Sequence, residues 1–251
     1  MYIRPVHAEH DLPTLHDFIR SNPLGVLTTA IESSTHHFLQ SSHIPWLLDE
    51  GGEKGLGVLR GHIARANPQA KAIIEDLTAG ASRASAPQLH KDVLVLFTGP
   101  AQHYITPKFY TETKPATGKV VPTWDYAAVQ AYGRATLFVE PADPRTDAFL
   151  ARQVADLSRF AEGTLMGYER PWSVDDAPEN YVALLKKAII GIEIEITDIA
   201  GRWKMSQELS AGDREGVVKG FEALGTPLAC DMAQAVRERD ELAQARKKAE
   251  A

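Results

Sequence analysis

The sequence predicts a mainly β fold, an antiparallel barrel with peripheral helices, and three observations lead to it. Short β-branched runs are separated by turn residues rather than by regularly spaced helices, which argues against a doubly wound sheet. Residues 189–199 (IIGIEIEITDI) alternate strictly between apolar and polar side chains, as in a strand with one wet face. No internal repeat and no low-complexity linker divides the chain. We therefore expect one continuous domain with helical additions.

The first half of the chain carries a helix and most of the predicted strands. Asp11 is expected to cap the helix, which should end before Asn22-Pro23. The Gly-rich stretch at 51–57 predicts a hairpin connection between two strands. The run DVLVLF predicts a buried strand that stops at Gly99-Pro100. The expected strands are 25–31, 38–48, 58–63, 92–97 and 129–140.

In the second half of the chain, the spacing of the apolar residues changes and predicts mostly helices. Residues 144–160 and 179–188 have helical spacing and few β-branched side chains. The alternating strand at 189–199 follows them. The tail from about Thr226 is again helical, and its end is nearly all charged residues and Ala, which is typical of a solvated helix that frays.

Composition limits the class of protein. The chain has 251 residues, of which 44% are hydrophobic and 24% charged, close to globular averages. A formal net charge of -6 opposes direct DNA binding, although a single phosphate needs only a few well-placed donors. Cys230 is the single cysteine, which excludes an intrachain disulfide and a Cys-rich metal site. Without a signal region or an apolar run of ~18 residues, we expect a soluble, intracellular protein of the cytoplasm, with the nucleus left open.

Several familiar catalytic motifs are missing. The sequence has no G-x-G-x-x-G opening a helix, no P-loop, no G-x-S-x-G and no H-E-x-x-H. The chain has nine histidines, and the local spacing of a helix-borne metal site is missing at His36, His37, His43, His62 and His103. Convergence of two of these in space is the alternative to our prediction of no metal centre.

Two polar segments interrupt apolar runs in the first half. SSHIP (41–45) places polar side chains inside a strand, where a wet barrel rim explains them as well as a ligand site does. GHIARANP (61–68) joins a strand to a helix and offers His62, Arg65 and Asn67 as donors for a phosphate monoester. The alternative is that Arg65 is an ordinary surface residue and Asn67 a helix cap.

Two further polar segments lie later in the chain. KVVPTWDYAAVQAYG (119–133) presents Thr123, Trp124 and Tyr126 just before a strand, where they could flank a planar ring system. An aromatic cluster that closes a barrel end or a dimer seam is the alternative. GRWKMSQE (201–208) offers Lys204 and Ser206, which could contact a phosphate or cap the end of the sheet.

Six blocks of the sequence, taken in order, resemble the PaiB-type (PAI 2-type) regulator family. They are NPLGVLTT, SSHIPWLL, GHIARANP, VLFTGPAQHYITPKFY, KVVPTWDYAAVQAYG and GRWKMSQE. The resemblance runs from MYIRP to about Glu208, and KFYTETKPATGKVVPTW is more similar to fungal members than to bacterial ones. It implies a split β-barrel of the flavin-reductase or pyridoxamine-phosphate-oxidase type, a homodimer with flavin mononucleotide (FMN) at the subunit interface. Residues 1–208 would form this domain and residues 209–251 a C-terminal helical extension.

The resemblance also implies roles for individual residues. GHIARANP would hold the FMN phosphate, the segment around Trp124 would lie along the ribityl chain or ring, and Lys204 would help to close the site. Tyr104, Thr106 and Tyr110 are candidates for the pocket rim. Asp125 departs from the family, which has Asn in its P-T-W-N-Y segment, and the extra negative charge could weaken flavin binding. The implied cofactor-binding residues are Ser42, His43, His62, Arg65, Asn67, Lys119, Thr123, Trp124, Tyr126, Lys204 and Ser206.

Three functions compete on this basis. The first is an FMN-binding protein, an oxidoreductase if it is an enzyme, with NAD(P)H as donor and His43 as the candidate for titration near neutral pH. The second is haem binding or degradation, which requires an axial histidine. The third is a ligand-sensing regulator of transcription that has no catalytic turnover. The axial candidates for haem are His36, His37, His62 and His103.

Overall fold

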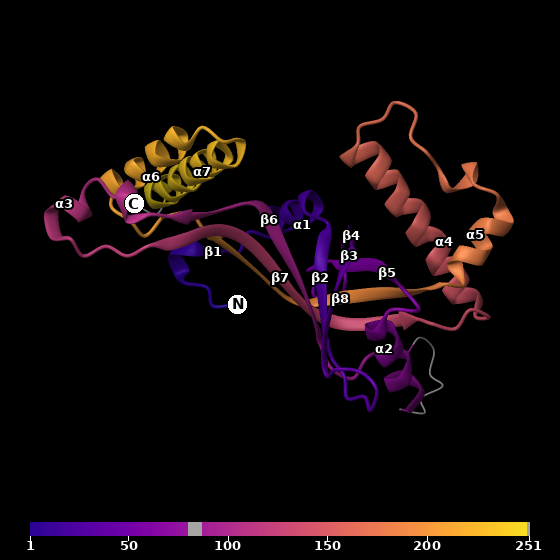
Figure 1. Cartoon of the computed structure of the whole chain (residues 1–251). Helices are drawn as coiled ribbons and strands as arrows, with labels where there is room; N and C mark the ends of the chain where they lie inside the picture. The colour runs from indigo at the N-terminus through magenta and orange to yellow at the C-terminus, as the bar shows by residue number, and fades with distance from the viewer. Residues whose placement is uncertain (80–86, 250–251) are drawn as a thin grey trace. The chain divides into compact units, whose positions relative to one another are not determined.

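The computed structural model describes residues 1–79 and 87–249 (Figure 1). Over these residues, eight strands form one sheet in the order β3-β2-β6-β7-β8-β5-β4, with β1 paired to β8. The strands are β1 (Ala8–Glu9), β2 (Leu24–Ala30), β3 (Leu39–Pro45), β4 (Leu47–Asp49), β5 (Val58–Ala64), β6 (Val93–Ile105), β7 (Thr123–Phe138) and β8 (Ile189–Lys204).

Seven α-helices accompany the sheet over the described residues, and the mainly β class with peripheral helices is confirmed. No helix in the described ranges has the length and apolar character needed to cross a bilayer. The helices are α1 (Leu12–Ser21), α2 (Pro68–Ala79), α3 (Thr113–Thr117), α4 (Pro144–Arg159), α5 (Glu179–Lys186), α6 (Ala211–Leu224) and α7 (Pro227–Ala249).

The chain separates into two compact units. The barrel unit comprises Ile19–Phe97 and Gln130–Ile199. The terminal unit holds both chain ends and comprises Met1–Phe18, Thr98–Val129 and Ala200–Ala251. The chain passes between the units within α1 and within the three long strands β6, β7 and β8.

The sheet of the barrel unit closes on itself. Its two end strands, β3 and β4, are consecutive in the sequence and are separated only by Trp46, so the ends of the sheet meet. Trp46 is buried, and a Cβ added at Gly61 would lie 2.9 Å from its ring, so Gly61 marks the inner face of β5. This closure confirms the barrel that the sequence predicts, and the split β-barrel that the family resemblance implies.

The hairpins of the barrel follow the turn residues of the sequence. β4 pairs with β5 in the register Leu48↔Leu59, which confirms the predicted connection at 51–57. Gly51 and Gly57 in this connection have φ values of 104° and 101°, a region that favours glycine.

The prediction that the strand at 92–97 stops at Gly99-Pro100 was wrong. β6 continues through Gly99-Pro100 to Ile105. Its pairing with β2 is recorded only for residues 94–96, so beyond them β6 is an edge on that side. Pro100 lacks an N–H, and an edge strand tolerates this because no ladder hydrogen bond is lost there. β7 and β8 are likewise longer than predicted.

Helix caps match the sequence at two positions. The Asp11 carboxylate accepts a hydrogen bond from the backbone N–H of Thr14 at 3.0 Å, which confirms the predicted cap of α1. In the barrel unit, Asn67 precedes α2, and its side-chain Oδ1 accepts from the N–H of Gln69 at 2.8 Å.

The C-terminal helices belong to the terminal unit. Arg239 and Arg246 of α7 bind the buried Glu9 carboxylate at 2.7 and 3.0 Å, and the Arg239 guanidinium lies 4.1 Å from the centre of the Trp203 ring. These contacts attach α7 to the unit by charge as well as by packing. The predicted division at residue 208 stays a prediction, and residues 250–251 of the extension lie outside the described range.

Candidate functional site

The structure brings together two of the predicted phosphate-side residues. Asn67 Nδ2 donates a hydrogen bond to Ser42 Oγ at 3.1 Å while its Oδ1 caps α2, so Asn67 is the helix cap that the sequence left open. The Ser42 hydroxyl keeps its own proton for another acceptor. Gln40 shares this face of β3, and its buried Nε2 has no hydrogen-bond partner among the described residues.

This donor set suits a phosphate ester. Two neutral donors, Ser42 and Asn67, lie beside the amino-terminal end of α2, where the helix dipole favours an anion. Gln40 lies two residues away on the same face of β3 and has an unpartnered Nε2 among the described residues. Gln40 was not among the residues that the sequence singled out. The alternation of β3 could have indicated it, because residues 40, 42 and 44 share a face.

His43 points to the other side of the strand. Ser42 pairs with the buried Leu27 on the inner face of the barrel, whereas His43 is exposed on the outer face. Ser41 shares that outer face, where its hydroxyl lies 2.9 Å from the hydroxyl of Thr28. Ser42 and His43 therefore cannot contact the same ligand group without a change in the strand.

Arg65 is directed to backbone carbonyls. Its Nη2 donates to the carbonyl of Val139 at 2.5 Å and its Nε donates to that of Lys187 at 3.4 Å. No hydrogen bond joins it to Ser42 or Asn67 within the described part of the chain. The guanidinium therefore links the segments that contain Val139 and Lys187, and it is not directed into an open anion site.

His62 lies on the outer face of β5, opposite the inward side of Gly61. Burial lowers the pKa of the His62 imidazole, so the ring is neutral at neutral pH. Its buried Nδ1 has no hydrogen-bond partner among the described residues. The barrel wall separates this ring from the inner face that carries Ser42.

The terminal unit contains a buried polar cluster around Asp125. Lys204 Nζ donates to Asp125 Oδ1 at 3.0 Å and to Thr123 Oγ1 at 2.8 Å. Ser206, which has a φ of 59°, donates to Asp125 Oδ2 at 2.7 Å. Burial raises the pKa of the Asp125 carboxyl, and the Lys204 ammonium opposes that rise. The charge of Asp125 is thus buried and balanced inside the protein.

Two residues that the sequence did not indicate extend this cluster. His7 Nε2 lies 2.9 Å from Glu208 Oε2, and Lys204 Nζ lies 3.7 Å from Glu208 Oε1. Burial would raise the pKa of Glu208, but the hydrogen bond from His7 and the charge of Lys204 lower it overall. No local pattern could have joined His7 to Glu208, because they are far apart in the sequence.

The predicted ring-side residues lie in the same unit. Trp124 is 51% exposed, and its ring centre lies 6.3 Å from that of the exposed Tyr104. Tyr126 lies under the Arg202 guanidinium at 5.3 Å, and Lys119 is exposed. Trp124 and Tyr104 therefore present aromatic surface to solvent, as a ring-binding role requires.

The rim candidates differ in exposure. Tyr110 is buried and donates to the carbonyl of Val121 at 3.4 Å. Burial, with the negative charge of Asp125, raises the pKa of Tyr110 to about 12. Thr106 caps a short 3-10 turn by accepting from the N–H of Lys108. Neither side chain is free at a surface.

The axial candidates for haem are scattered. His36 Nε2 lies 3.7 Å from Glu75 and His37 is exposed. The His103 Nδ1 atom lies 2.8 Å from the carbonyl of Tyr104, and its ring packs edge-on against Phe221. Across residues 1–79 and 87–249, no group of three or more His, Cys, Asp or Glu side chains could hold a metal ion.

Several known proteins are similar to this chain. A protein of Aspergillus fumigatus, described as uncharacterized, is 54% identical over 257 residues, which cover 96% of this chain and 98% of the relative. The protease synthase and sporulation protein PAI 2 of Bacillus subtilis is 23% identical over 95% of this chain and 98% of its own. A crystal structure of a conserved hypothetical protein from Mycobacterium tuberculosis has a TM-score of 0.48 at 14% identity, covering 84% of this chain and 94% of that one.

These relatives confirm the resemblance to the PAI 2-type proteins and the closeness to fungal sequences. A family model with the description "Putative FMN-binding domain" matches residues 1–198. That match spans the barrel unit except its last residue, and the first two of the three segments of the terminal unit. The chain belongs to this family of FMN-binding domains.

Proposed function

We propose that this protein binds FMN and holds its phosphate at the amino-terminal end of α2. The observation that carries the proposal is the family match over residues 1–198. The donor chemistry of Ser42, Asn67 and Gln40 supports it, because a phosphate dianion needs donors and a positive end of a helix. Arg65 and His62 take part only if they leave their present surroundings.

The residues have separate tasks in this proposal. Asn67 fixes the start of α2 and turns the Ser42 hydroxyl toward the ligand. Trp124 and Tyr104, which belong to the terminal unit, are a separate candidate for stacking a planar ring. A bound flavin would supply hydride and electron chemistry, which protein side chains do not provide. We therefore propose an FMN-dependent oxidoreductase with a nicotinamide donor as the activity.

We also propose that the protein works as a homodimer. The outer face of the β2–β3 hairpin exposes Leu24 and Leu39, which are 58% and 65% exposed beside His43 and Ser41. Apolar side chains of this size on a sheet face suit contact with a second copy. Sedimentation velocity measures this directly, and a monomer at all concentrations contradicts it.

The phosphate position is tested by titrating the protein with FMN and with riboflavin, which lacks the phosphate. Asn67→Asp keeps the helix cap, because aspartate accepts from Gln69 as asparagine does, but it removes the donor and adds a negative charge. We expect Asn67→Asp to weaken FMN binding at least tenfold and to leave riboflavin binding unchanged.

A matched pair of serines controls this experiment. Ser42→Ala removes the inward hydroxyl and should weaken FMN binding, while Ser41→Ala removes an exposed hydroxyl on the opposite face and should not. Equal effects of the two substitutions would contradict the phosphate position.

The absorption spectrum of the purified protein separates the other functions. Flavin bands with turnover of NAD(P)H support the oxidoreductase, and flavin bands without turnover favour the ligand-sensing regulator. A Soret band, with no change on addition of FMN, would replace flavin by haem. The half-buried His62, with its unpaired Nδ1, would then be the first axial candidate to test.

A further inference from the structure

Residues 165–185 of the barrel unit form a surface rich in exposed apolar side chains. We call it the 165–185 surface. It follows the π-helix η3 (Phe160–Leu165) and includes η4 (Val174–Asp176) and most of α5. Its exposed large apolar side chains have 47–64% of their surface accessible, although large apolar side chains are usually buried. Among them are Leu165, Met166, Trp172, Tyr181, Leu184 and Leu185.

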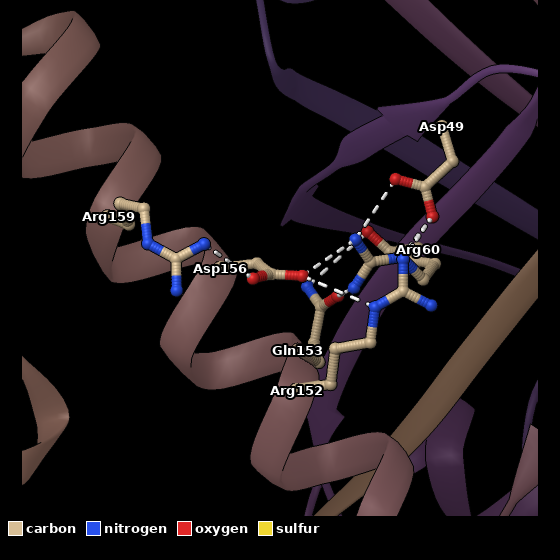
Figure 2. A network of polar contacts seen from close by, with 6 residues as sticks. All are labelled: Asp49, Arg60, Arg152, Gln153, Asp156 and Arg159. Atoms are coloured by element: carbon tan, nitrogen blue, oxygen red, sulfur yellow. Dashed lines mark hydrogen bonds and ion pairs between the residues drawn. The ribbon is translucent and has the colours of Figure 1, made fainter.

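The helix that leads into this surface is firmly held. Figure 2 shows Arg60 of β5 reaching toward Asp156 and Gln153 of α4, and the Arg60 guanidinium also binds Asp49. Arg60 is 3% exposed and Gln153 is fully buried, so this network is internal to the unit. The ring of Phe149 on α4 stacks on Phe138 with centres 3.9 Å apart.

α5 is in turn tied to α4. Lys186 Nζ donates to Asp147 Oδ1 at 2.6 Å. The Trp172 backbone N–H donates to the Glu162 carboxylate at 3.1 Å, which fixes the loop between η3 and η4. These contacts tie α5 and the loop before it to α4 and η3, while the large apolar side chains of the region stay about half exposed.

The charge around the 165–185 surface has one predominant sign. Its carboxylates are Glu169, Asp175, Asp176 and Glu179, and its single base is Arg170, which gives a formal net charge of -3. All five side chains are exposed. Two of the carboxylates, Asp175 and Glu179, also line a cavity of about 540 Å³. Its other charged lining residues are Lys186 and Asp147, which bind each other, so the cavity keeps an excess of negative charge. The 165–185 surface thus carries both exposed apolar side chains and an excess of carboxylates.

We propose that the 165–185 surface binds a basic amphipathic segment of another protein. Apolar anchors on one face of such a segment would cover Leu184 and Leu185, and its Lys and Arg side chains would meet the carboxylates. A second copy of this chain fits less well, because a two-fold contact would bring two surfaces of like charge together. An anionic bilayer is disfavoured for the same reason.

The test uses a fluorescein-labelled helical peptide of alternating Leu and Lys composition, with a Leu–Glu peptide of the same pattern as control. Anisotropy titrations with the full chain should show binding of the Leu–Lys peptide that weakens with salt, and none of the Leu–Glu peptide. Asp175→Asn combined with Glu179→Gln should weaken binding and reduce the salt dependence.

Two leucines of equal exposure give the matched control. Leu185 and Leu224 are both 48% exposed, but Leu224 lies on α6 in the terminal unit. Leu185→Ser should weaken binding at least about tenfold, because it replaces an apolar anchor by a polar side chain, and Leu224→Ser should not.

Four outcomes would overturn the proposal. The first two are equal binding of the Leu–Lys peptide by the two leucine variants, and no binding of that peptide at all. The third is self-association of the protein that only Leu185→Ser abolishes. The fourth is binding to phosphatidylcholine vesicles that only Leu185→Ser abolishes. The third would assign the surface to a second copy, and the fourth would assign it to a membrane.

Discussion

Lys204 and Asp125 form a buried ion pair at the centre of the terminal unit, with Nζ 3.0 Å from Oδ1 and the Asp125 side chain inaccessible to solvent. The pair explains how the chain tolerates a carboxylate at this buried position. Ser206 and Thr123 complete the hydrogen bonds of the two partners. Such a pair is costly to break from one side, because the remaining charge stays buried.

Lys204→Met should therefore destabilise the protein strongly. Removing the cation leaves the Asp125 carboxylate with Ser206 alone, and we expect the free energy of unfolding to fall by about 3–5 kcal/mol. Lys204→Met combined with Asp125→Asn should recover most of that loss, since neither charge remains. Urea denaturation measures both variants, and a double variant no more stable than Lys204→Met would show that the pair does not matter.

The docking of α7 through Glu9 predicts a pH dependence of stability. Burial would raise the pKa of Glu9, but hydrogen bonds from the Asp11 backbone N–H, Arg239 and Arg246 lower it below 4.5 overall. Because the folded pKa is the lower one, the stabilisation is fully present above pH 4.5 and is lost as the pH falls through the folded pKa. Urea midpoints should decrease over this acid range.

Glu9→Gln provides the control for this dependence. The variant lacks the titrating carboxylate, so it should be less stable at neutral pH and should show a shallower decrease in acid. If both proteins lose stability in parallel as the pH falls, other carboxylates cause the acid sensitivity.

Much of the fold could be predicted from local sequence, and the parts that could not depend on partners distant in the chain. The alternation at 189–199 and the cap at Asp11 are local signals, and the structure confirms both. The end of β6 could not be read locally, because Pro100 is tolerated only where β2 no longer pairs with the strand.

The candidate site shows the same limit. The sequence could place Ser42 and His43 in one strand, but the strand's alternation puts them on opposite faces of the barrel. Motif spacing likewise grouped Arg65 with Asn67, whereas the structure turns Arg65 to the carbonyls of Val139 and Lys187. The direction of the Arg65 side chain depends on carbonyl groups far away in the sequence, so a local sequence pattern cannot predict it.

Arg65→Ala separates the structural role of Arg65 from a role in binding. The carbonyl of Val139 would lose a charged donor, so we expect the free energy of unfolding to fall by about 1–3 kcal/mol. FMN affinity should change less than in Asn67→Asp, because the guanidinium has no contact with Ser42 or Asn67 in the described chain. If Arg65→Ala abolishes FMN binding while Asn67→Asp does not, the phosphate lies at Arg65 and the position proposed at α2 is wrong.

Trp124 allows the ring side of the flavin to be tested without an assay of activity. A flavin stacked on an indole quenches its fluorescence, so FMN should quench the native protein more than Trp124→Phe. Trp172→Phe is the matched control, because Trp172 is 47% exposed against 51% for Trp124 but belongs to the 165–185 surface. Trp46 and Trp203 are buried and contribute a background common to all three proteins. Quenching that disappears in Trp172→Phe and persists in Trp124→Phe would contradict the ring-side assignment and would move the flavin ring to the 165–185 surface.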